Sequence, residues 1–171
     1  TALGTITASA RAGMGSAKSS TKLWAIANTG QDGQTMSANI GAVSSQRSDS
    51  FWLNLTLAAA PAVDGRSGLV GFVSDGYTAD WADAPGTAVL YATLGLKGGQ
   101  YAVDVFDKST GAAPATQDVT SVGFDPAGHF VASHDQIAGT SVNGNCEWAF
   151  GGSDGTRENS CWGNWDDNVL N

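Results

Sequence analysis

Short β-rich segments separated by turn-forming residues follow one another along the chain of 171 residues. No apolar stripe with helical spacing is sustained anywhere, which argues against a helical bundle. Many short strands divided by turns are instead typical of sandwiches, jelly rolls and barrels. The sequence therefore predicts an all-β fold, an antiparallel β-sandwich with jelly-roll-like character. The turn signals are Gly30-Gln31-Asp32-Gly33, Asp64-Gly65, Asp75-Gly76, Pro85-Gly86, Asp125-Pro126 and Gly151-Gly152.

The clearest strand lies at residues 50–59, where apolar and polar residues alternate. Period-two alternation puts Leu53 and Leu55 on one face and Trp52 on the other. A hairpin is expected at residues 87–96 and 100–107, because Gly98 and Gly99 supply the positive φ of a tight turn. Residues 78–84 are expected to form one helical turn that ends before Pro85. Further strands are predicted at 4–11, 21–28, 34–43, 68–74, 119–124, 129–133 and 146–150.

The length fits one domain that covers residues 1–171. Its first 20 residues are rich in small side chains, with Ile6 as the main apolar anchor. Two interpretations of this segment stay open: a flexible terminus, or an extended arm that adds a strand to a neighbouring subunit.

The net charge is −8, and the eight lysines and arginines are scattered along the chain. No basic patch is available to neutralise phosphates, so nucleic acid and anionic membrane surfaces are poor partners. No apolar run has the length of a membrane span, so membrane insertion is not expected. The chain opens on Thr1, which fits a mature secreted product, and we expect an extracellular location.

Cys146 and Cys161 are the two cysteines of the chain, and 14 residues separate them. Their spacing matches no zinc motif, so we expect a disulfide that closes the C-terminal loop. Closing a loop of this length stabilises a fold by about 3 kcal/mol on the chain-entropy account. The alternative is a pair of free thiols.

Aromatic and polar residues gather in this C-terminal segment, a mixture that suits sugars, because rings stack on C–H surfaces while carboxylates bind hydroxyls. The alternative interpretation is that the rings cover the open end of a core. The candidate ligand-binding residues of the segment are Glu147, Trp148, Glu158, Trp162, Trp165 and Asp166.

A second patch at residues 75–83 adds Tyr77 and Trp81 to the candidate ligand-binding residues. Its carboxylates, Asp75, Asp80 and Asp83, are candidate calcium ligands, although their spacing does not match an EF-hand loop. The alternative is that these residues are solvated turn and capping groups. Calcium is thus an open alternative, and no other cofactor is indicated.

Three functions fit these patterns. The first is a non-enzymatic extracellular binding module for a glycan or polysaccharide; the composition resembles that of secreted β-sandwich lectins and adhesins. The second is a self-associating structural subunit of a surface layer, pilus or virion-like assembly, with Trp52 among its interface residues. The third is a secreted polysaccharide-cleaving enzyme that uses Glu147 and Glu158 as its carboxylate pair. No other catalytic constellation is evident, so an enzyme is the less favoured class.

Overall fold

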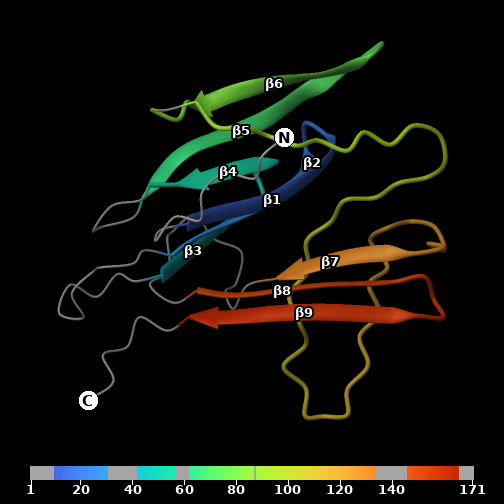
Figure 1. Ribbon diagram of the computed structural model, residues 1–171. Coiled ribbons are helices and arrows are strands. Elements are labelled where there is room, and N and C mark those ends of the chain that lie inside the picture. Colours follow the sequence, from blue (N-terminus) through green and yellow to red (C-terminus); the bar gives the residue numbers. More distant parts are fainter. Residues whose placement is uncertain (1–9, 31–41, 57–61, 87, 134–145, 166–171) are drawn as a thin grey trace, which may run out of the picture.

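Nine antiparallel strands, without a helix, form the regular structure of the residues described in the computed structural model, which are 10–30, 42–56, 62–86, 88–133 and 146–165 (Figure 1). The strands make three sheets of three, and in each sheet strands consecutive in the sequence pair with one another. The prediction of an all-β fold is therefore confirmed.

Each sheet is a simple meander, so every pairing joins neighbours in the chain. Sheet A consists of β1 (Ala10–Ser19), β2 (Lys22–Gly30) and β3 (Ala42–Arg47). Sheet B consists of β4 (Trp52–Leu55), β5 (Val63–Val73) and β6 (Gly76–Asp83). Sheet C consists of β7 (His129–Ser133), β8 (Cys146–Ser153) and β9 (Glu158–Trp165).

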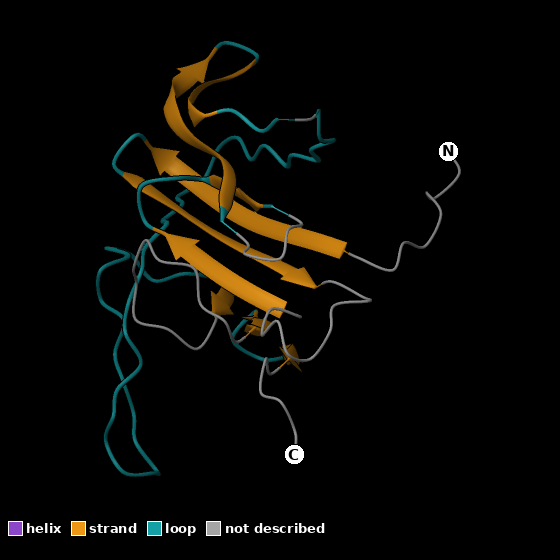
Figure 2. Cartoon of the chain, turned by 90° about the vertical axis from the view of Figure 1, so that its left-hand side faces the viewer, coloured by secondary structure: helices purple, strands orange, loops and turns teal. Residues whose placement is uncertain are grey.

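Sheet A lies between the other two sheets in the view of Figure 1. Strands β1 and β2 pack against β4, and β1 also contacts β5, so sheets A and B meet face to face. Strand β3 contacts β8, which joins sheet A to sheet C. The chain between β6 and β7 contains neither helix nor strand in its described part, residues 84–86 and 88–128, and appears as teal loops in Figure 2.

The core between sheets A and B is made of small residues on one side and leucines on the other. Ala25 and Ala27 of β2 face Leu53 and Leu55 of β4, and each of the four is at most 2% exposed. Val63 packs at the border of this cluster. Burying each leucine contributes about 1.5–3 kcal/mol relative to an exposed position. Both leucines lie on the face that the alternation at residues 50–59 predicts to be buried.

Two glycines allow β1 to lie directly against β4. A Cβ atom at Gly13 would come within 2.9 Å of the Leu53 carbonyl oxygen, and one at Gly15 would overlap the Phe51 carbonyl. Both glycines occupy positions opposite the core alanines, since Gly13 pairs with Ala27 and Gly15 with Ala25. Any side chain here would force the two sheets apart.

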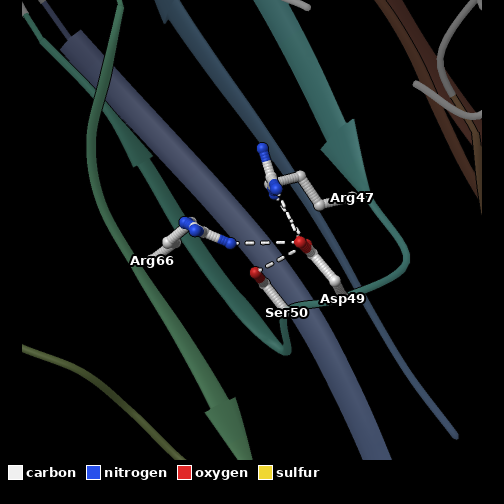
Figure 3. Close-up of polar contacts among 4 residues, drawn as sticks. All are labelled: Arg47, Asp49, Ser50 and Arg66. Atoms are coloured by element: carbon white, nitrogen blue, oxygen red, sulfur yellow. Dashed lines mark hydrogen bonds and ion pairs between the residues drawn. The ribbon is translucent and has the colours of Figure 1, made fainter. Parts of the chain in front are cut away.

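An ion-pair network closes the connection from β3 to β4 (Figure 3). The guanidinium of Arg47 donates from Nε to Asp49 Oδ1 at 2.6 Å and from Nη2 to Oδ2 at 2.5 Å. Arg66 of β5 donates to Oδ2 at 3.0 Å, and the Ser50 hydroxyl donates to Oδ1 at 3.0 Å. The hydrogen bonds from Arg47 are the main reason that the pKa of Asp49 falls from 3.8 to about 2.

Several strand predictions are confirmed. The strand at 129–133 coincides with β7, the one at 21–28 nearly coincides with β2, and the one at 68–74 forms the distal half of β5. Residues 146–150 begin β8. The predicted strands at 4–11 and 34–43 lie mostly outside the described residues.

Three local predictions were wrong. Residues 78–84 form no helical turn but belong largely to β6, because Thr78 and its neighbours pair with β5, with Thr78 opposite Gly71. The described parts of the predicted hairpin, 88–96 and 100–107, form no strands, although Gly98 and Gly99 do adopt positive φ. Residues 119–124 also form no strand.

The predicted N-terminal arm is only partly tested by the structure. Its second half, Ala10–Ser19, is β1 and pairs with β2 of the same chain along its length. Residues 1–9 lie outside the described part.

Replacing Gly15 with alanine should lower the free energy of unfolding by about 1–3 kcal/mol, because the new methyl group meets the backbone of β4. Chemical denaturation would measure the change. Gly71→Ala is the matched control, because its Cβ would enter open space within a strand. Equal stability of the two variants would contradict the close contact between β1 and β4.

Replacing Asp49 with asparagine should lower stability at pH 7 by about 1 kcal/mol, a figure kept small because the carboxylate is half-exposed. The folded-state pKa lies below the ordinary value, so the carboxylate stabilises the fold above about pH 5, and this contribution is lost as the pH falls toward 2. Denaturation curves should thus converge for wild type and variant at low pH. The control Asp125→Asn, at an exposed position, should change stability little at either pH.

Candidate functional site

The C-terminal candidate residues lie on the β8–β9 hairpin of sheet C. The ring of Trp148 lies over Gly163 of β9, where a Cβ atom would come within 2.7 Å of the indole. Its other neighbour is Phe150, with ring centroids 5.0 Å apart and a tilt of 47°. Both rings are half-buried, so Trp148 covers its own sheet and is not an open platform.

The structure gives only backbone positions for several other candidates. Glu147 pairs with Asn164, Trp162 with Ala149, and Trp165 with Cys146, but the side chains of these candidates lie outside the described part. Asp166 lies outside it altogether. Glu158 is exposed at the start of β9 and pairs with Ser153.

The expected disulfide is not supported by the structure. In the β8–β9 register Cys161 stands opposite Phe150, four positions from Cys146, and its thiol is free and exposed. Four strand residues span about 13 Å, whereas a disulfide requires Cα atoms within about 7 Å. The hairpin is therefore closed by its ladder of backbone hydrogen bonds.

The same register separates the two glutamates proposed as a catalytic pair. Glu158 stands opposite Ser153, which is six positions from Glu147 along β8. This distance is about 20 Å of strand, and glycosidase carboxylates lie about 5–9.5 Å apart. Two glutamate side chains cannot bridge the difference, so Glu147 and Glu158 do not form such a pair.

The three candidate calcium ligands do not converge. Asp75 is in the turn before β6, while Asp80 and Asp83 are spread along β6, opposite Gly68 and Arg66. No group of three potential metal ligands occurs among the described residues. These carboxylates are therefore placed as solvated turn and strand residues, the alternative raised by the sequence.

An aromatic cluster on sheet B is the most distinctive surface feature. We define it as Trp52 of β4, Trp81 of β6 and Tyr91 of the chain that follows β6. Trp52 meets Trp81 at 4.9 Å and 71°, and Tyr91 at 4.6 Å and 86°. Trp81 and Tyr91 are 5.7 Å apart and are 43% and 37% exposed, so both rings are open to solvent on one side.

Short residues beneath the aromatic cluster bring the rings together. Trp52 and Trp81 both stand opposite Ser67 of β5, whose hydroxyl donates to the Asp80 carbonyl at 3.0 Å. A Cβ atom at Gly65 would come within 3.0 Å of the Trp52 ring. Small residues in the central strand thus leave room for the indoles above it. Tyr77, the other candidate of this region, instead meets Phe51 edge to face at 5.6 Å.

A polar network lies close to the aromatic cluster. Arg11 of β1 donates from Nη1 to the Leu55 carbonyl at 3.1 Å and to Asp64 Oδ2 at 2.8 Å. Asn54 Nδ2 donates to the same carboxylate oxygen at 3.2 Å. Burial raises the pKa of the Tyr91 hydroxyl, the charge of Arg11 lowers it and that of Asp64 raises it. The phenol therefore stays protonated at neutral pH and can donate a hydrogen bond.

Of the aromatic cluster, only Trp81 was a ligand-binding candidate from the sequence. The sequence did indicate that Trp52 lies on the other face of its strand from the core leucines. Nothing local marked Tyr91, because its partners Trp52 and Trp81 lie 39 and 10 residues earlier in the chain.

No protein-family model, curated protein or solved structure matches this chain. Among the described residues, the structure contains no helix that is both long and apolar enough to cross a membrane. The function must therefore be argued from the sites themselves.

Alkylation of the native, unreduced protein with iodoacetamide should label Cys161, because its thiol is free and exposed. Peptide mass spectrometry would locate the label. A peptide in which Cys146 and Cys161 are linked would contradict the β8–β9 register.

Proposed function

We propose that this chain is a non-enzymatic, extracellular carbohydrate-binding module that binds glycan through the aromatic cluster. The observation that carries the proposal is the solvent exposure of Trp81 and Tyr91 within a cluster whose third ring, Trp52, is held against sheet B. Single exposed rings are common on protein surfaces, but three in mutual contact form a coherent apolar patch.

The chemistry of the aromatic cluster suits a sugar. Aromatic faces bind the C–H surface of a pyranose, while hydroxyls need donors and acceptors at the border. Asp64 and Asn54 lie near the rings, and the Tyr91 hydroxyl adds a donor. Asn54 and Asp64 are already hydrogen-bonded to each other, which lowers the ordering cost of binding.

We also propose that the fold is a β-sandwich and that the protein is extracellular. Sheets A and B pack face to face, and we interpret this pair as a β-sandwich that carries the aromatic cluster on its outer surface. The extracellular location rests on composition alone, because the free thiol of Cys161 removes the disulfide as an argument. Whether glycan binding requires calcium is tested by measuring it with and without the ion.

Replacing Trp81 with alanine should weaken glycan binding about tenfold or more, because it removes the most exposed ring of the aromatic cluster. A glycan array with and without calcium would identify the ligand, and calorimetry would then compare the variants. Trp81→Phe, which keeps a ring, should retain part of the affinity.

The control is Phe72→Ala, which removes another exposed aromatic ring of sheet B that is not part of the aromatic cluster. Unchanged affinity in Trp81→Ala would exclude the cluster as the binding site. Absence of binding to every arrayed glycan would overturn the proposed function.

A structural subunit is the second candidate, and one observation favours it. Val70, Phe72 and Val73 are 54–63% exposed on the part of β5 that extends beyond β4 (Figure 1). Among the described strands, this part of β5 pairs with β6 alone, and an apolar strand with one open edge favours association. Sedimentation over a range of concentrations separates the candidates, because a strict monomer is incompatible with assembly.

A further inference from the structure

An open depression of about 500 Å³ lies on sheet C, away from the residues of the aromatic cluster. Its border includes one row of three residues across the sheet, because His129 of β7 pairs with Ser153 of β8, which pairs with Glu158 of β9. Two positions further along the strands, and so on the same face of the sheet, the row Val131, Gly151 and Ser160 also lines it. The volume is in the range of small-molecule sites.

The floor of this depression is flat because glycine occupies its centre. Gly151 stands between Val131 and Ser160, so no side chain rises from the middle strand at this position. One face of a ligand ring can therefore approach the backbone, with the Val131 side chain as an apolar contact and polar groups around it.

The end of the depression is held by a tight turn between β8 and β9. The backbone N–H groups of Thr156 and Arg157 donate to Asp154 Oδ1 at 2.9 and 2.7 Å, and that of Gly155 donates to the Ser153 hydroxyl oxygen at 2.9 Å. These bonds fix both strands where Ser153 and Glu158 project. The site is thus built on paired strands and needs little ordering.

The order of the row argues for binding and not for catalysis. A hydrolytic triad needs the imidazole between the serine and the carboxylate, but here Ser153 stands between His129 and Glu158. The groups instead offer a carboxylate acceptor, an imidazole whose ring nitrogens can form hydrogen bonds, and two hydroxyls. A saturated ring that carries several hydroxyls, as in a sugar, meets all of these requirements.

The negative charge around the depression favours an uncharged ligand over an anionic one. Glu158 and Asp154 lie beside Arg157 at this end of the hairpin, and the whole chain carries a net charge of −8. Anionic sugars would approach against this field, whereas an uncharged sugar can donate two hydroxyls to the Glu158 carboxylate.

We propose that the depression formed by His129, Ser153 and Glu158 is a second sugar subsite, which takes a pyranose without an acidic group. This inference rests on the proposed function and extends it, because two subsites on different sheets would let one chain bind a polymeric glycan at two points. Two linked contacts raise the overall affinity above that of either one.

The test is an NMR titration of the ¹⁵N-labelled full chain with methyl β-D-glucopyranoside, methyl β-D-galactopyranoside, methyl α-D-mannopyranoside and methyl β-D-glucuronide. At least one uncharged sugar should shift the amide signals of Gly151, Ser153 and Ser160. The glucuronide should shift them less at the same concentration. Glu158→Gln should raise the dissociation constant fitted from these shifts about tenfold or more, because it removes a charged acceptor.

The charge-matched control is Asp118→Asn, an exposed position that does not line the depression. The ¹H–¹⁵N spectrum of each variant verifies that it is folded. If Glu158→Gln disturbs the fold, His129→Gln provides the second variant and should also weaken the shifts.

The position of the shifts separates this inference from the proposed function. Shifts confined to Trp52, Trp81 and Tyr91 would overturn the second subsite and leave the aromatic cluster intact. Shifts at Gly151, Ser153 and Ser160 that persist in Trp81→Ala would support it. No shift at these three amides with any uncharged sugar, or equal shifts with the glucuronide, would also overturn it.

Discussion

The direct contact between the backbones of β1 and β4 is the constraint on which the arrangement of sheets A and B depends. It exists because Gly13 and Gly15 have no side chains where β4 passes. The two sheets are close enough for alanines to fill one side of the core and for Leu53 and Leu55 to fill the other. With its leucines turned inward, β4 directs Trp52 to the opposite face, where the aromatic cluster forms.

Three arginine–aspartate contacts hold β4 at its two ends, two of them near its start and one near its end. At its start, Asp49 accepts hydrogen bonds from Arg47 and Arg66, which ties the β3–β4 connection to β5. At its end, Arg11 donates to the Leu55 carbonyl and to Asp64, which ties β1 to the last residue of β4 and to the beginning of β5. These contacts pair three of the chain's eight basic side chains with carboxylates. The remaining basic side chains are few beside the 16 acidic ones, so a ligand meets a predominantly negative chain.

The sequence predicted features that depend on neighbouring residues, such as the buried face of a strand. It did not predict features that depend on strand pairing, register or tertiary packing. Alternation located the leucine core because each residue's face follows from its position along a strand. The helical turn at 78–84 failed because pairing with β5 overrides the preference of a short segment. The cysteine pairing is not supported, because the register that places Cys161 opposite Phe150 cannot be read from the spacing of the two cysteines. The contact of Tyr91 with Trp52 arises only from tertiary packing.

The position of Tyr91 has a consequence for the long segment between β6 and β7. This segment has no strands of its own in its described part, yet Tyr91 holds its beginning against sheet B, and Asp104 forms an ion pair with Lys22 at 3.5 Å. A ligand that stacks on Tyr91 would therefore contact this segment as well as sheet B. Binding at the aromatic cluster would then also protect the segment from proteases, because a ligand stabilises the arrangement to which it binds.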